Sequence, residues 1–385
     1  MSLTNTFTSA SINGWRSVSS SNYFLNSNLI NDAPLVTSFG YTTSISDNCE
    51  YIIVGSFPDD NVYIFKNNYD GTYTQQVTFS YASNVQSVSI NSTGEYAVVS
   101  LTSSVINIYY RSGSTWSLQQ TISVVFGITA EISGDGNYII VGGRTGGTRP
   151  QAYIYIRSGT TWSLQTTILP TGTTAGSSES VTINYDGTYV AFASQDQNSQ
   201  LGRVWIYTRS GTTWTQQAIF NLNNYSSQIN INASCTSLSM NYAGTYVVVN
   251  APYAGPTNYP GQAFIFKRTG STWAYDASLT GTGSADENFA FGVRVCKSED
   301  IFIASATFAD TAGYTNNGAI YVFQKPINDP ILLQILSGPN QNSVNNFTDP
   351  NGLAIDNTGN WIAGGATGAD IYGTNNGVVL IYSIT

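Results

Sequence analysis

The sequence predicts an all-β protein, a seven-bladed β-propeller in which each blade is a four-stranded antiparallel sheet. Three observations support this prediction. One short phrase occurs four times, a longer unit of two paired strands occurs seven times, and apolar residues alternate with period two without a convincing helical pattern. The copies lie roughly 40 to 60 residues apart, in the range of propellers with four strands per blade.

The short phrase combines an Arg, a Gly-containing turn and a Trp. It reads RSGSTWSLQQT from Arg111, RSGTTWSLQTT from Arg157, RSGTTWTQQA from Arg209 and, more loosely, RTGSTWAYDA from Arg268. An alternating apolar run precedes each copy. The phrase is therefore predicted to be the hairpin between the third and fourth strands of a blade.

The longer unit contains the first two strands of a blade around a tight turn, as in EISGDGNYIIVGG from Glu131. Its second strand is apolar almost throughout, which is typical of a strand buried on both faces. We expect residues 1–385 to form one domain, with an N-terminal segment 1–38 before the repeats. The repeats are centred near the aligned aromatic positions Tyr51, Tyr96, Tyr138, Tyr189, Tyr246, Phe302 and Trp361.

The Trp of the short phrase is predicted to start the outermost strand and to pack into the blade. A buried aromatic removes about 150–250 Å² from water, so the position favours a structural role. A sugar platform repeated around the rim is the alternative. The residues are Trp116, Trp162, Trp214 and Trp273, and Trp15 is assigned the same role.

The ring is predicted to close through its N-terminal segment. The sequence ends in GVVLIYSIT, a third strand without a following fourth strand, and INGWRSVSS from Ile12 is similar to the start of the other fourth strands. We therefore expect residues near 14–20 to pair with residues 377–384. This pairing joins the N-terminal strand to the C-terminal blade and removes exposed sheet edges.

The composition excludes several function classes. Charged residues make up 9% of the chain, the net charge is −9, and the 13 Lys and Arg form no basic cluster, which disfavours nucleic-acid binding and binding to anionic membranes. No apolar run is long enough for a transmembrane helix, and the N-terminal residues do not form a secretory signal peptide. The three cysteines, Cys49, Cys235 and Cys296, are interpreted as small buried apolar residues.

Histidine is absent from the chain. Its absence removes Ser-His-Asp and Cys-His catalysis, histidine acid-base chemistry and every histidine-containing metal site. We therefore expect a non-enzymatic protein with no catalytic residues, no metal and no cofactor.

The repeat unit resembles the FG-GAP repeat of integrin-α-type seven-bladed propellers, over about residues 39–385. The FG element stands at Phe39-Gly40, Phe126-Gly127 and Phe291-Gly292, and GAP-like elements at 250–252 and 364–366. The resemblance implies a propeller of the kind found in bacterial surface proteins and in large DNA viruses. It does not extend to calcium, which needs six to eight oxygen ligands, because the turns hold too few carboxylates, such as Asp135, Asp186 and Asp356.

The connections between the second and third strands, and from the fourth strand to the next blade, vary in length and grow toward the C-terminus. Loops on a rigid scaffold commonly carry recognition, and Tyr among Asn, Ser and Gly suits adaptable polar contacts. A solvated face of turn-forming residues is the alternative. The candidate contacts are Tyr253, Tyr259, Asp286, Glu287, Asp310, Tyr314, Asp370 and Tyr372.

The function predicted from these features is a structural or adhesion-type interaction module on a virion or cell surface, which docks a protein partner through the long-loop face. The location is expected to be the virion surface or the extracellular side. A lectin-like propeller that binds surface glycans is one alternative. A His-free glycosidase or lyase is another, and it needs a pocket with converging acids.

Overall fold

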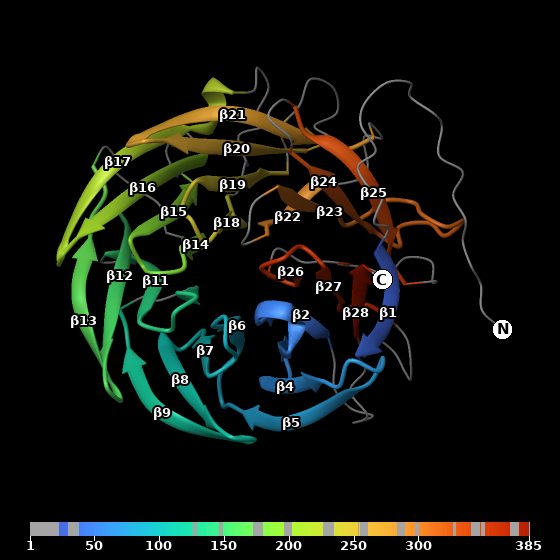
Figure 1. The fold of residues 1–385 in the computed structure, drawn as a ribbon, viewed down its shortest axis with the longest axis horizontal. Coiled ribbons are helices and arrows are strands. Elements are labelled where there is room, and N and C mark those ends of the chain that lie inside the picture. The colour runs from blue at the N-terminus through green and yellow to red at the C-terminus, as the bar shows by residue number, and fades with distance from the viewer. Residues whose placement is uncertain are drawn as a thin grey trace.

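The computed structural model describes residues 23–29, 38–125, 129–145, 149–171, 180–195, 202–225, 235–252, 254, 261–282, 289–296, 300–325, 329–339, 347, 351–369 and 377–384. These residues form seven four-stranded antiparallel sheets arranged as a ring around a central axis (Figure 1). The predicted all-β, seven-bladed propeller is confirmed.

Each blade runs from an inner strand at the axis to an outer strand at the rim. Blade 1 contains β2 (Phe39–Ile45), β3 (Tyr51–Ser56), β4 (Asn61–Asn67) and β5 (Tyr73–Ser80). Blade 2 contains β6 (Val85–Ile90), β7 (Tyr96–Leu101), β8 (Val105–Ser112) and β9 (Thr115–Ser123). Blade 3 contains β10 (Ala130–Ile132), β11 (Tyr138–Thr145), β12 (Arg149–Ser158) and β13 (Thr161–Ile168).

The remaining blades repeat this order. Blade 4 contains β14 (Ser180–Ile183), β15 (Tyr189–Gln195), β16 (Gly202–Ser210) and β17 (Thr213–Asn221). Blade 5 contains β18 (Leu238–Met240), β19 (Tyr246–Ala251), β20 (Gln262–Thr269) and β21 (Thr272–Thr280). Blade 6 contains β22 (Phe289–Val295), β23 (Ile301–Ala306), β24 (Ala319–Gln324) and β25 (Ile331–Ser337). Blade 7 contains β26 (Leu353–Ile355), β27 (Trp361–Ala366), β28 (Val378–Ile384) and the N-terminal strand β1 (Tyr23–Leu29). Two short 3₁₀ turns are η1 (Asp47–Cys49) and η2 (Leu222–Asn224).

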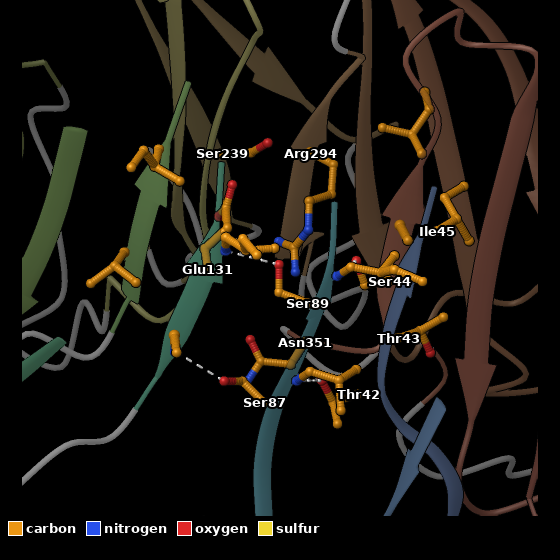
Figure 2. Close-up of a pocket in the computed structure, with 18 of the residues that line it drawn as sticks. Thr42, Thr43, Ser44, Ile45, Ser87, Ser89, Glu131, Ser239, Arg294 and Asn351 are labelled. Carbon is orange, nitrogen blue, oxygen red and sulfur yellow. Dashed lines mark hydrogen bonds between the residues drawn. The ribbon is translucent and has the colours of Figure 1, made fainter. Parts of the chain in front are cut away.

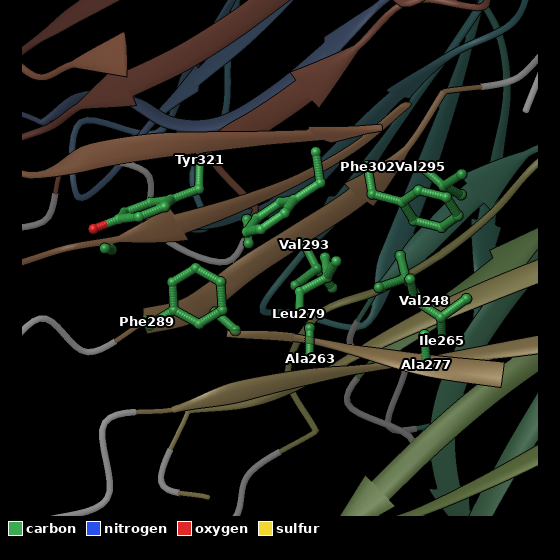
Figure 3. Packing of buried hydrophobic residues seen from close by; sticks show 14 of the residues in the cluster. Val248, Ala263, Ile265, Ala277, Leu279, Phe289, Val293, Val295, Phe302 and Tyr321 are labelled. Carbon is green, nitrogen blue, oxygen red and sulfur yellow. The ribbon is translucent and has the colours of Figure 1, made fainter. Parts of the chain in front are cut away.

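The hydrophobic core lies between neighbouring blades. Between blades 5 and 6, Val248 and Ile265 face Phe302 and Val295, and Phe289 packs edge-on against Tyr321 (Figure 3). The second and third strands of each blade contribute to the clusters on both sides, which explains why their sequences are apolar almost throughout.

In blades 2 to 5, the short repeated phrase packs each blade against the preceding one. The guanidinium of Arg111 in blade 2 lies 4.3 Å from the ring centroid of Tyr51 in blade 1, and Trp116 meets the same ring edge-on. Gly94, in the tight turn of blade 2, also lies against Tyr51, where a side chain would collide with the ring. The same cation–π contact joins Arg157 to Tyr96, Arg209 to Tyr138 and Arg268 to Tyr189.

The outer strands add a second contact between blades. In blades 2 to 5, the outer strand has a β-bulge three residues after its Trp, and the bulged residue is a Gln in blades 2 to 4. The indole nitrogen of Trp162 donates a hydrogen bond of 2.9 Å to the bulged Gln119 of the preceding blade. Trp214 and Trp273 donate in the same way to Gln165 and Gln217. In blade 6, Lys325 instead forms an ion pair of 2.7 Å with the bulged Asp276 of blade 5.

The N-terminal segment closes the ring as predicted, but the closing strand lies later in the sequence than predicted. Residues 23–29 pair with β28, whereas the prediction named residues near 14–20, which lie outside the described residues together with Trp15. The bulge of β1 is at Asn26, so Tyr23 takes the position that Trp has in other blades. Tyr23 is buried, and its hydroxyl donates to the carbonyl of Gly359. The outer strand of blade 7 is therefore identified by a buried aromatic side chain three residues before the bulge. The Gly-x-x-Trp spacing does not identify it.

One aligned position of the repeats also needs correction. The second strand of blade 6 begins at Ile301, whose carbonyl accepts the hydrogen bond from the Cys296 amide that closes the turn. Ile301 therefore corresponds to Tyr51 and Tyr96, and the predicted Phe302 lies one residue further along. Phe302 is fully buried and packs edge-on against Tyr246 of blade 5.

The FG elements pack on the GAP-like elements of the preceding blade. Gly40 has φ +97° and approaches Gly365 so closely that a Cβ on Gly40 would lie 2.9 Å from the Cα of Gly365. In blade 6 the carbonyl of Phe291 accepts a 2.9 Å hydrogen bond from the side chain of Asn250. The FG and GAP-like elements therefore pack against each other between neighbouring blades. Phe126-Gly127 lies outside the described residues.

Candidate functional site

The inner strands line a polar channel along the propeller axis. Their inward edges have amide groups without a neighbouring strand in the same sheet, and hydroxyls of the preceding blade satisfy many of them. Thr42 and Ser44 accept hydrogen bonds from the amides of Val88 and Ile90, at 3.1 and 3.2 Å. The same pattern recurs from blade 2 to 3, blade 4 to 5 and blade 5 to 6. The Ser and Thr content of the inner strands therefore stabilises the ring.

Seven structurally equivalent positions of the inner strands form what we call the channel ring. Each lies two residues before the residue whose amide closes the tight turn between the first and second strands of its blade. Five of them are Ser, Thr or Ala, and the two exceptions carry opposite charges. Glu131 comes from blade 3 and Arg294 from blade 6, so the charges enter from well-separated sides of the axis. The channel ring consists of Ser44, Ser89, Glu131, Thr182, Ser239, Arg294 and Ala354.

Arg294 reaches into the channel from β22. Its Nη1 donates to the hydroxyl of Ser237 at 2.8 Å and to the carbonyl of Val293 at 2.7 Å. Figure 2 shows the side chain among the inner strands, with Ser89, Ser239 and Glu131 drawn around it. Loss of hydration lowers the pKa of Arg294 to about 10, although the negative charge of Glu131 acts in the opposite direction. Glu131 itself accepts a hydrogen bond of 3.3 Å from Thr182.

One end of the channel is crossed by a hydrogen bond between distant blades. The phenol of Tyr242 in blade 5 donates to a carboxylate oxygen of Asp47 in blade 1 at 2.6 Å. Tyr185 packs edge-on against Tyr242, with ring centroids 4.8 Å apart. Burial, and then the negative charge of Asp47, raise the pKa of Tyr242 well above its usual range. This end lies on the side of the tight turns.

The channel contains a cavity of about 110 Å³. That volume has room for several water molecules or one small polar molecule. Hydroxyls of the inner strands line it together with Glu131 and Arg294 (Figure 2). Asp47 and Tyr242 also line it. The chemistry of the lining is therefore polar and charged, unlike the apolar lining of most drug-sized ligand pockets.

A second feature lies on the outer rim of blades 6 and 7. The outer strands of other blades are mostly polar, whereas β25 and β1 expose consecutive large apolar side chains. The amide and carbonyl of Tyr23 each form a hydrogen bond with the side chain of Gln334, at 2.8 and 2.9 Å, so the two strands lie side by side. We call this surface the apolar rim, and it consists of Phe24, Leu25, Ile331, Leu332 and Leu333.

Most of the loop residues named from the sequence lie outside the described residues: Tyr253, Tyr259, Asp286, Glu287, Asp370 and Tyr372. The other two lie in the connection between β23 and β24. Asp310 is exposed and its carboxylate accepts a 2.7 Å hydrogen bond from the amide of Asn316. Tyr314 is half-buried and bridges Thr311. These two contacts lie within the connection itself.

The Trp residues of the short phrase pack inside the blades. Trp116, Trp162 and Trp273 are buried, and Trp214 is half-buried against the core between blades 3 and 4. Their indole rings meet tyrosines of the preceding blade or bond to its Gln residues, so these rings fill space between blades.

The acids of the tight turns bind the backbone of their own turns. Asp135 accepts a 2.9 Å bond from the amide of Asn137, and Asp356 a 3.1 Å bond from that of Trp361. Burial acts to raise the pKa of Asp186, but hydrogen bonds from Thr188 and Asn184 outweigh it and the pKa is lowered.

No group of three or more Cys, Asp or Glu able to hold a metal ion occurs among the residues that the structure describes. Across the same residues, no helix has the length and apolar composition required to cross a membrane.

The sequence analysis missed the charged pair of the channel ring and the apolar rim. Both can be found by aligning the repeats position by position. Glu131 and Arg294 then stand where other blades have small residues, and Phe24 and Ile331 stand where other blades have Ser, Thr or Ala.

No family model matches the sequence, and no curated protein matches it. Among solved structures, the chain is similar to a chain in the crystal structure of the mitotic checkpoint complex, a WD40 propeller, with a TM-score of 0.61. The sequence identity is 12%, and the match covers 98% of each chain. At this identity the likeness establishes the β-propeller fold alone.

Proposed function

We propose that the protein is a non-enzymatic interaction module and that it docks a partner protein through the apolar rim. The observation that supports this proposal is the continuous exposure of apolar side chains on two adjacent outer strands. Phe24, Leu25 and Ile331 are 51%, 54% and 54% exposed. Contiguous apolar patches on soluble proteins mark interaction surfaces, because their burial against a partner is favourable.

The contrast with other blades supports this interpretation. Leu118 and Leu164 are similarly exposed, but each is flanked by polar residues such as Ser117 and Gln119. A single exposed leucine is ordinary on a protein surface. Within the described residues, only blades 6 and 7 expose large apolar side chains at successive positions of their outer strands.

The setting that we propose is a large assembly such as a virion or a cell surface. The scarcity of charge, the polar surface rich in Ser, Thr, Asn and Tyr, and the FG-GAP resemblance support it. We infer that the propeller supplies a rigid body whose rim is fixed by contacts between blades. The connections on the long-loop face, including Asp310 and Tyr314, are then a second and more polar contact surface.

Site-specific photo-crosslinking in the native source tests the docking proposal. A photoreactive amino acid replaces Ile331 in one variant and Leu118, the matched control, in another. We expect Ile331 to cross-link to one defined protein and Leu118 not to do so. Equal cross-linking from both positions, absence of cross-linking, or cross-linking only to a second copy of this chain would each contradict docking of a partner protein at the apolar rim.

A further inference from the structure

The channel presents hydrogen-bond donors to its interior. The hydroxyl oxygens of Ser44, Ser89 and Ser239 accept bonds from the amides of the next blade. A hydroxyl whose oxygen accepts one bond still has its O–H to donate. Arg294, whose guanidinium can only donate, lines the same cavity. The lining therefore matches a ligand that brings acceptor oxygens.

The charges of the lining restrict the class of ligand further. Two carboxylates, Glu131 and Asp47, line the cavity with one guanidinium, Arg294. A bare anion would meet an excess of negative charge, and a bare cation would meet Arg294 and the hydroxyl donors. A small molecule that carries both a carboxylate and an ammonium group is complementary to this arrangement.

We propose that the channel is a binding site for a small zwitterion of the α-amino-acid class. The carboxylate of the ligand binds Arg294 and the hydroxyls of Ser89 and Ser239, and its ammonium group faces Glu131. The cavity of about 110 Å³ limits the ligand to the smallest members of the class.

Isothermal titration calorimetry with glycine and L-serine tests this site on the full chain. Acetate and methylammonium, which carry only one of the two charges, serve as matched ligands. We expect saturable binding of glycine or L-serine and much weaker binding of the singly charged compounds. Equal binding of acetate would assign an anion site, equal binding of methylammonium a cation site, and no saturable heat an empty polar channel. Each of these results overturns the proposal.

Variants place the binding within the channel. Glu131→Gln and Arg294→Gln each remove one charge and are expected to lower the affinity about thirtyfold or more. Glu95→Gln, at an exposed carboxylate in the turn of blade 2, is the control and leaves the affinity unchanged. Ser239→Ala, which removes one donor and keeps both charges, provides a second test if Arg294→Gln fails to fold. Unchanged affinity in Glu131→Gln and Ser239→Ala would place the ligand elsewhere.

Discussion

At the scale of single residues, the repeated phrase is explained by contacts that cross from one blade to the next. The Arg and the Trp of one blade both contact a Tyr ring of the preceding blade, and the indole N–H donates a hydrogen bond to a Gln of that blade. A buried indole N–H without a partner is costly, so the Gln stabilises the Trp in the three pairs where the two bond. The phrase is repeated because blades 2 to 5 pack on the preceding blade through the same set of contacts.

The contribution of the Gln can be measured directly. Trp162 is 3% exposed and donates to Gln119, so Gln119→Ala leaves a buried donor unpaired. We expect the free energy of unfolding to fall by about 1–2 kcal/mol in chemical denaturation. Gln76→Ala is the matched control, because the Trp116 indole nitrogen has no hydrogen-bond partner and Gln76 bonds to the carbonyl of Thr74. Equal losses in both variants would contradict this role of the Gln.

At the scale of elements, β1 shows how one strand closes a ring. It docks on β25 through Gln334 just as β13 docks on β9 through Gln120, and the same bulge sets its register. The outermost strand of blade 7 therefore comes from the opposite end of the sequence. Closure of this kind ties the N-terminal segment to the stability of the entire ring.

Truncation of the β1 aromatic tests this closure. Tyr23 is buried in the cluster between blades 6 and 7, so Tyr23→Ala is expected to lower the free energy of unfolding by about 3–5 kcal/mol. The neighbouring Phe24 is exposed, and Phe24→Ala is expected to change it by less than about 0.5 kcal/mol. Denaturant titration of the two variants gives both values. A small effect of Tyr23→Ala would mean that β1 contributes little to closure.

The sequence predicted the strands whose pattern repeats and failed where one blade departs from it. Strand order, the tight turns and the buried Trp residues follow from alternation and from repeated Gly and Trp. The position of β1 did not follow, because Tyr23 replaces the Trp that marks other outer strands, and Trp15 offered a more familiar spacing. The start of β23 was shifted because Ile301 replaces the aromatic residue. The channel ring was missed since its residues meet only when the blades close into a ring.

At the scale of the whole molecule, many tyrosines are buried between blades and held neutral. Loss of hydration raises the pKa of each well above the usual value near 10. The strongest cases are Tyr23, Tyr73, Tyr81, Tyr242 and Tyr382. Above that usual value the unfolded chain loses protons that the folded chain keeps, so stability falls as the pH rises.

The protein is therefore expected to lose stability in alkali. We expect no effect from these tyrosines below about pH 9, and above about pH 10 a loss approaching 1.4 kcal/mol per pH unit for each tyrosine that stays protonated. Thermal unfolding between pH 8 and 11.5 measures this slope. Tyr242→Phe removes one such group, so its slope should be shallower than that of the unmodified protein. An unchanged midpoint up to pH 11.5 would contradict the account.

The central claim for the whole molecule is that a rigid ring presents the apolar rim to a partner protein. Hydrogen–deuterium exchange of the free chain and of the chain in its native assembly tests this claim most directly. We predict slower exchange in the assembly for β1 and β25, with little change in β9 and β13 at the opposite part of the rim. Protection confined to the connection 306–318 on the long-loop face, with β1 and β25 unchanged, would contradict it.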